Sequence, residues 1–167
     1  MLYDDTGSLP KASNDGRSLE VSIVSMDELS AQILETACRF VEICDPRTGG
    51  KLDYSEASLV IVEEMLADAA DFADEMSDAR ISALVREFGC YILEVGRREF
   101  GGSYLWYEQK EQPVLVVGEP LFRVAMLAWD KVSSRIAGDD SDNIPFHYAG
   151  FARRVRQATP EIDALYT

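Results

Sequence analysis

A single histidine, His147, is the only side chain of the sequence whose ordinary pKa lies close to neutral pH. Catalysis by a Ser–His or Cys–His pair would therefore have to use it. It stands between Phe146 and Tyr148 with no carboxylate beside it. The sequence also lacks a G-x-S-x-G elbow, a P-loop and a G-x-G-x-x-G motif. This pattern predicts a packed, hydrogen-bonded histidine and a protein with no catalytic site.

Metal binding and redox chemistry receive no more support from the sequence. One histidine excludes most zinc sites. The acidic loop at 139–143 lacks the glycine and the distal glutamate that a calcium loop requires. Cys38, Cys44 and Cys90 match no zinc or redox spacing, and we expect them to be reduced thiols of a cytoplasmic protein. We therefore expect neither a metal nor a cofactor.

Charge gives the sequence its most distinctive property. The 167 residues carry a formal net charge of −14. Residues 1–80 contain 18 acidic and 6 basic side chains, whereas residues 81–167 contain 12 and 10. Such a charge repels nucleic acids and anionic membranes, so neither is expected as a partner. No apolar run approaches the length of a membrane span, and the sequence predicts a protein that stays in the cytoplasm.

Much of this acidity falls on one predicted helix, at about 55–76. Its apolar residues recur at helical spacing, and the opposite side carries carboxylates with no Lys or Arg between Lys51 and Arg80. Carboxylates four residues apart lie side by side and repel one another. An exposed helix face offers no water-poor cleft for acid–base catalysis, so we interpret these residues as a surface for a basic protein partner. The predicted surface comprises Val60, Glu63, Glu64, Asp68, Asp71 and Glu75.

The remaining pattern predicts one α+β domain with about five helices around a small antiparallel sheet. Residues 1–18 are expected to be a mobile N-terminal arm, 19–158 the domain, and 159–167 a C-terminal tail. A strand is considered at 19–24, and the hairpin is predicted at 104–117. The helices are expected at about 26–44, where Asp45-Pro46 ends the first, then at 55–76, 78–100, 121–136 and 146–157. Gly89 and Gly96 share one face of the third helix and indicate close packing there.

Residues 79–151 resemble a group of small uncharacterised bacterial proteins, known only as domains of unknown function. The matching positions are Phe88-Gly89, Glu94, Phe100-Gly101-Gly102, Trp106, Pro120-Leu121, Lys131, Arg135-Ile136 and Phe146 to Tyr148. The resemblance covers under half of the chain, and most of its motifs are structural. It implies a bacterial, cytoplasmic α+β unit and supplies no activity.

Three functional hypotheses follow. The first is a non-catalytic acidic binding protein that engages a basic protein, such as a bacterial immunity or inhibitor protein that neutralises a toxin; this rests on an analogy of size and charge. The second is a small-molecule-binding domain or an unrecognised enzyme, with a pocket between the hairpin and the helices. That pocket would be lined by Trp106, Arg123, Trp129 and His147. The third is a homo-oligomeric structural module.

Overall fold

The computed structural model describes residues 26–167. The arm predicted at 1–18 and the strand considered at 19–24 lie outside the described residues. The helices are α1 (Met26–Thr48), α2 (Leu59–Asp71), α3 (Asp78–Phe100), α4 (Trp129–Ile136) and α5 (Ile144–Arg156). The strands are β1 (Ser103–Tyr107), β2 (Gln112–Val117), β3 (Arg123–Leu127) and β4 (Asp163–Tyr166). The predicted single α+β domain with five helices is confirmed for the described part of the chain.

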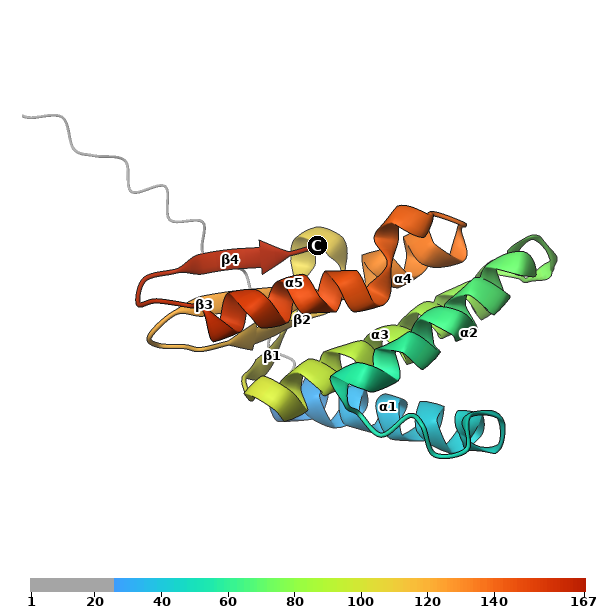
Figure 1. The fold of residues 1–167 in the computed structure, drawn as a ribbon, viewed down its shortest axis with the longest axis horizontal. Helices are drawn as coiled ribbons and strands as arrows, with labels where there is room; N and C mark the ends of the chain where they lie inside the picture. The colour runs from blue at the N-terminus through green and yellow to red at the C-terminus, as the bar shows by residue number, and fades with distance from the viewer. Residues whose placement is uncertain (1–25) are drawn as a thin grey trace, which may run out of the picture.

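Helix α3 lies at the centre of the fold. Its middle turns are buried on all sides, and Tyr91, Ile92 and Val95 have no exposed surface. It packs against α1, α4 and strand β2, while α2 packs against α4 and α5. Figure 1 shows α5 lying along the sheet, with α1, α2 and α3 grouped to one side of it. The central helix therefore joins the helical part of the molecule to the sheet.

The sheet has the order β1-β2-β3-β4 and is mixed. Strands β1, β2 and β3 are antiparallel neighbours, and Leu115 of β2 pairs with Tyr104 on one side and Met126 on the other. These three side chains belong to the face that packs against the helices. Strand β4 pairs with β3 in parallel, so the sheet is not wholly antiparallel as the sequence predicted. Strand β4 lies in the segment 159–167, which was expected to be a tail.

The predicted helix at 121–136 is the main error in the sequence-based assignment of elements. Arg123–Leu127 forms strand β3, and α4 begins only at Trp129. A short apolar run of this kind fits a buried strand or a buried helix equally well by periodicity alone. This run forms a strand because it pairs with β2 on one side and with β4 on the other, and the two pairings satisfy the backbone hydrogen-bonding groups of β3.

Two helix ends also differ from the prediction. Helix α1 continues past Pro46 to Thr48, and its last turn is closed by a hydrogen bond from the Gly49 N–H to the Asp45 carbonyl (2.8 Å). The second helix is shorter than expected: α2 ends at Asp71, and a separate 3₁₀ turn, η2 (Ala73–Glu75), follows Phe72. The acidic segment is therefore a helix followed by a turn.

Close packing at the two glycines of α3 is confirmed. A Cβ atom at Gly89 would overlap the indole ring of Trp129 at Cδ1. At Gly96, a Cβ atom would lie 2.8 Å from Leu115 Cδ2. In both places the close neighbour is a side chain rather than another backbone. Gly89 in particular lets the indole of Trp129 approach α3 closely, beside Cys90.

Candidate functional site

The outer side of α2 and η2 carries five of the six residues predicted to meet a partner. Val60, Glu64, Asp68, Asp71 and Glu75 are all exposed. The four residues on α2 follow one another at intervals of three or four, which aligns them along one stripe of the helix, and Glu75 follows on η2. We call these five residues the acidic face. It is opposite the buried side chains that attach α2 to the core, namely Leu59, Val62 and Leu66.

No side chain of the fold neutralises the acidic face. Within residues 26–167, its four carboxylates make no ion pair and no side-chain hydrogen bond. Two exposed apolar side chains accompany them: Val60 is 52% exposed within the acidic face, and Phe72, just beyond α2, is 59% exposed. The surface therefore combines unpaired negative charge with apolar area that the fold leaves uncovered.

Glu63 belongs to the interior side of α2 and not to the acidic face. Its Oε1 accepts a hydrogen bond from Arg135 Nε at 2.6 Å, and its Oε2 accepts one from the backbone N–H of Ile144 at 3.0 Å. Arg135 is buried, and the hydrogen bond to Glu63 raises the pKa of its guanidinium group. The carboxylate thus ties α2 to α4 and to the first turn of α5, which leaves it no free oxygen for a partner.

Glu94 is another carboxylate that the fold uses internally. It is fully buried on α3, and its oxygens accept hydrogen bonds from Arg97, Arg98 and Tyr104 at 2.8–2.9 Å. Burial alone would raise the pKa of this carboxyl, but the three donors outweigh burial and hold the pKa below its ordinary value. The arrangement stabilises the ionised carboxylate and gives it no exposed surface on which to bind a ligand.

The structure separates the four residues of the predicted pocket. Trp106 and Trp129 come together, with ring centroids 6.2 Å apart in an edge-on arrangement. Arg123 lines a separate apolar depression with Trp106, Leu105 and Leu165, and its Nε lies 3.7 Å from Glu119 Oε1. The pocket predicted from sequence therefore does not exist as one site: Trp106 shares one hollow with Trp129 and another with Arg123, and His147 lines neither.

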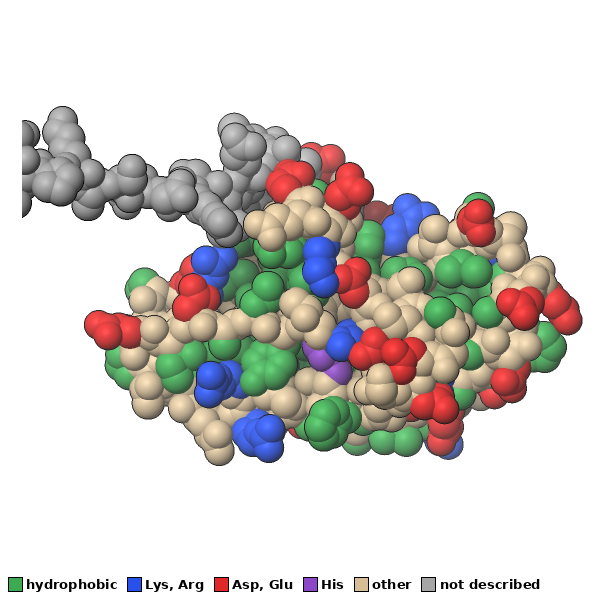
Figure 2. Space-filling model, turned by 90° about the horizontal axis from the view of Figure 1, so that it is seen from above, with side chains coloured by type: hydrophobic (Ala, Val, Ile, Leu, Met, Phe, Trp, Pro, Cys, Tyr) green, Lys and Arg blue, Asp and Glu red, His purple; other side chains and the backbone are tan. Residues whose placement is uncertain are grey.

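His147 lies in a different hollow, against α4 and β4. Its Nε2 lies 3.0 Å from the Leu127 carbonyl oxygen, so in the neutral ring this nitrogen is the donor. Burial lowers the pKa of the imidazole because it disfavours the charged form. Figure 2 shows the ring as the small purple patch between basic and acidic side chains. The nearest charged neighbours are Lys131 and Asp142, which pair with each other at 2.7 Å. The predicted packed and hydrogen-bonded histidine is confirmed.

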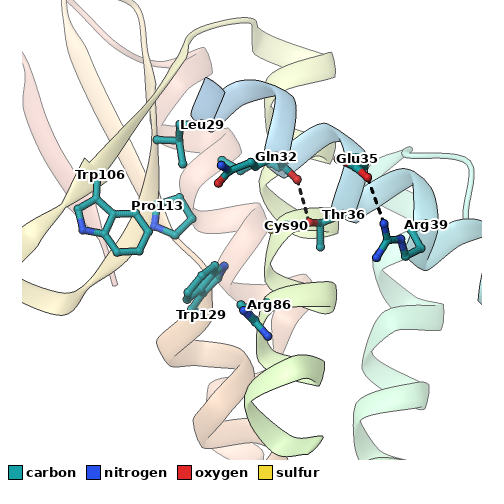
Figure 3. A pocket seen from close by; sticks show the side chains of 11 residues that line it. Leu29, Gln32, Glu35, Thr36, Arg39, Arg86, Cys90, Trp106, Pro113 and Trp129 are labelled. Atoms are coloured by element: carbon teal, nitrogen blue, oxygen red, sulfur yellow. Dashed lines mark hydrogen bonds and ion pairs between the residues drawn. The ribbon is translucent and has the colours of Figure 1, made fainter. Parts of the chain in front are cut away.

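The two tryptophans line a cavity between α1, α3 and the β1–β2 hairpin, with a volume of about 290 Å³. We call it the α1–α3 cavity. Figure 3 shows Trp106, Pro113 and Leu29 at one end and the Arg39–Glu35 pair at the other, with Arg86 beside Trp129. Sequence reasoning missed Arg39 and Arg86. Each looks like an ordinary exposed residue on its own helix, and only the packing of α1 on α3 brings them to one cavity.

Comparison with known proteins adds no assignment. No family of known proteins, no curated protein and no solved structure matches the chain. Within residues 26–167, no cluster of His, Cys, Asp and Glu side chains could hold a metal ion. No helix in the same range is long and apolar enough to cross a membrane. The acidic face and the α1–α3 cavity are two features of the described chain that could bind a partner or a ligand.

Proposed function

We propose that this chain is a non-catalytic binding protein whose acidic face docks a basic protein. The observation that carries the proposal is the lack of any cationic partner for Glu64, Asp68, Asp71 and Glu75 within the described residues. Four unpaired carboxylates on one stripe repel one another, at a cost of a few tenths of a kcal/mol per adjacent pair. A basic partner would remove that repulsion and gain the attraction of every carboxylate.

The composition of the surface suits a protein partner better than a small cation. Specific interfaces bury an apolar centre inside a polar, charged rim, and the charges mainly accelerate and orient the encounter. Val60 supplies apolar area within the acidic face, and Phe72 supplies more between α2 and η2. The partner that fits is therefore a protein with clustered Lys and Arg side chains around an apolar patch.

An immunity or inhibitor protein is the member of this class that we favour. A small, acidic chain that binds a basic toxin needs a preformed charged surface and no catalytic group of its own. The described chain supports this with an acidic face on a well-packed helix and a histidine held by a backbone carbonyl. Three free cysteines, two of them buried, suit the reducing conditions of the cytoplasm, which is the location we propose.

The proposal is tested by affinity capture from a lysate of the native host, with three forms of the immobilised chain. One is the wild type, and the second carries Glu64→Lys, Asp68→Lys and Asp71→Lys. The third carries Glu42→Lys, Glu108→Lys and Glu111→Lys, three exposed acidic positions off the acidic face. The two variants have the same net charge, so their comparison isolates position from total charge.

We expect the wild type and the control variant to retain the same basic protein, and the acidic-face variant to lose it. Co-expression then tests the inhibitor hypothesis: the retained protein should impair growth alone, and the wild-type chain should relieve the impairment where the acidic-face variant does not. Equal retention by all three forms, or a retained protein without excess Lys and Arg, would contradict the docking surface. A harmless basic partner would contradict only the inhibitor role.

A further inference from the structure

Trp129, which lines the α1–α3 cavity, and Gln112, which contacts Trp129, carry buried hydrogen-bond donors without a strong acceptor. Gln112 Oε1 accepts the backbone N–H of Trp129 at 3.0 Å, which fixes the orientation of the amide. The Gln112 Nε2 group is then left buried without a hydrogen-bond partner, and the indole Nε1–H of Trp129 has only the thiol of Cys90, a weak acceptor, beside it. Trp129 lines the cavity, as does Pro113, the residue after Gln112. Buried donors without acceptors are uncommon and point to a missing acceptor.

The polar part of the same cavity carries excess positive charge. Arg86, from α3, has no carboxylate partner anywhere in residues 26–167. Arg39, from α1, pairs only with Glu35 at 3.1 Å, and both side chains of that pair are largely exposed. The lining of the cavity therefore contains two guanidinium groups and one carboxylate, on a protein whose overall charge is −14. The sign of this local charge is opposite to that of the acidic face.

The rest of the cavity wall is apolar and aromatic. Trp106 and Trp129 meet edge to face, and Leu29 and Pro113 complete this end (Figure 3). Cys90 also lines the cavity, where burial raises the pKa of its thiol to about 12. At neutral pH the thiol is therefore uncharged and does not repel an anion. Aromatic walls bind a flat apolar body, and Arg binds a carboxylate through two parallel hydrogen bonds.

We infer that the α1–α3 cavity binds a small aromatic carboxylate, with the ring against Trp106 and Trp129 and the carboxylate directed to Arg86. A volume of about 290 Å³ suits a ligand of this size. Neither α2 nor any residue of the acidic face lines the cavity. The inference is therefore independent of the proposed docking of a basic protein, and each can be wrong without the other.

The test uses the two indole N–H signals of the NMR spectrum, because the chain has two tryptophans and both line the cavity. Benzoate is the probe, and benzamide is its neutral counterpart of the same shape. Trp106→Phe assigns the signals by removing one of them. We expect benzoate to shift the Trp129 indole signal saturably. Benzamide should bind at least about tenfold more weakly, since a charge-assisted hydrogen bond is worth about this factor or more.

Matched variants on α3 test the role of Arg86. Arg86→Gln should weaken benzoate binding about tenfold or more. Arg80→Gln removes the same charge from an exposed position on the same helix that does not line the cavity, and it should bind benzoate like the wild type. The inference is overturned if benzoate gives no saturable shift, if benzamide binds equally well, or if Arg86→Gln binds benzoate as tightly as Arg80→Gln does.

Discussion

Two sets of carboxylates on the helices have opposite surroundings in this protein. We call Glu63, Glu94 and the partly exposed Glu99 the inner carboxylates, because each is held by donors from within the fold. The outer carboxylates are Glu64, Asp68, Asp71 and Glu75, and none has such a partner in the described chain. Glu63 and Glu64 are adjacent in sequence, so a rotation of about 100° along one helix separates the two groups.

The difference shows which carboxylates the fold needs. Glu63 binds Arg135, which is 72 residues further along the chain, and Glu99 accepts a hydrogen bond from Tyr148 at 2.7 Å across 49 residues. These contacts join elements that are distant in sequence, so losing one should loosen the fold. The outer carboxylates join nothing and repel one another. If they serve the protein, they serve it through a partner, and this is the basis of the proposed function.

The largest expected effect comes from comparing the two adjacent residues directly. Glu63→Ala leaves the buried Arg135 with only the exposed Asp140 at 3.2 Å, and it leaves the Ile144 N–H without its acceptor. We expect the free energy of unfolding to fall by about 3 kcal/mol. Glu64→Ala should change it by no more than about 0.5 kcal/mol. Urea unfolding measures both, and equal losses in the two variants would erase the distinction between inner and outer carboxylates.

A smaller loss is expected when an inner carboxylate keeps its shape and loses its charge. Glu94→Gln still fills the space beside Tyr104, but it removes the negative charge that faces Arg97 and Arg98 and replaces one accepting oxygen with an NH2 group that cannot accept their hydrogen bonds. We expect a loss of about 1.5–3 kcal/mol in the free energy of unfolding. Asp68→Asn makes the same change to an outer carboxylate and should cause no loss in the free energy of unfolding. A Glu94→Gln variant as stable as the wild type would show that the buried charge contributes nothing.

The pH dependence of stability should follow from the same inner carboxylate. The pKa of Glu94 is lower in the folded chain than its ordinary value of 4.5, so the unfolded chain binds the proton first. Its stabilising contribution is present above that value and is lost as the pH falls through the lower folded pKa. Between about pH 5 and about pH 3, Glu94→Gln should therefore lose less stability than the wild type. If urea unfolding shows that the wild type and Glu94→Gln lose the same amount of stability across this pH range, Glu94 is not the source of the pH dependence.

The smallest effect should be a gain in stability on the outer side. Asp68 lies four residues after Glu64 and three before Asp71, so it repels both. Asp68→Asn removes both repulsions and should raise the free energy of unfolding by about 0.2–0.5 kcal/mol for each. The gain should shrink in concentrated salt, where exposed charges are screened. A loss of stability in low salt would mean that the fold uses Asp68 after all.

Helical periodicity was enough to predict the scaffold of the acidic face. The apolar repeat through Leu59, Val62 and Leu66 shows which side of α2 is buried, and the outward direction of Asp68 follows from it. Glu63 was misplaced because it lies beside the boundary between the two sides. The Glu63 side chain is directed inward by its hydrogen bond with Arg135, and no local sequence pattern predicts a partner so far along the chain.

The sheet and the cavity depended on contacts that the sequence does not display. Strand β3 could be assigned only from its pairing with β2 and β4, and the short strand β4 has no pattern of its own. Trp106 and Trp129 were predicted to share a pocket, and they do. Arg123 and His147 were grouped with them on composition alone. The packing of the elements places His147 in another hollow, and it places Arg123 beside Trp106 in a depression that Trp129 does not line.

The measurement that tests the central claim most directly is the association rate of the chain with its captured basic partner, recorded by stopped flow at several salt concentrations. Attraction between charged surfaces raises association rates by about 10-fold to 10³-fold and is screened within about 10 Å at 0.1 M salt. For the wild type we predict a rate that falls steeply with salt. The variant with Glu64→Lys, Asp68→Lys and Asp71→Lys should associate at least about tenfold more slowly in low salt. The control variant with Glu42→Lys, Glu108→Lys and Glu111→Lys should stay close to the wild type. Equal rates for the two variants at every salt concentration would contradict the proposal that the acidic face is the docking surface.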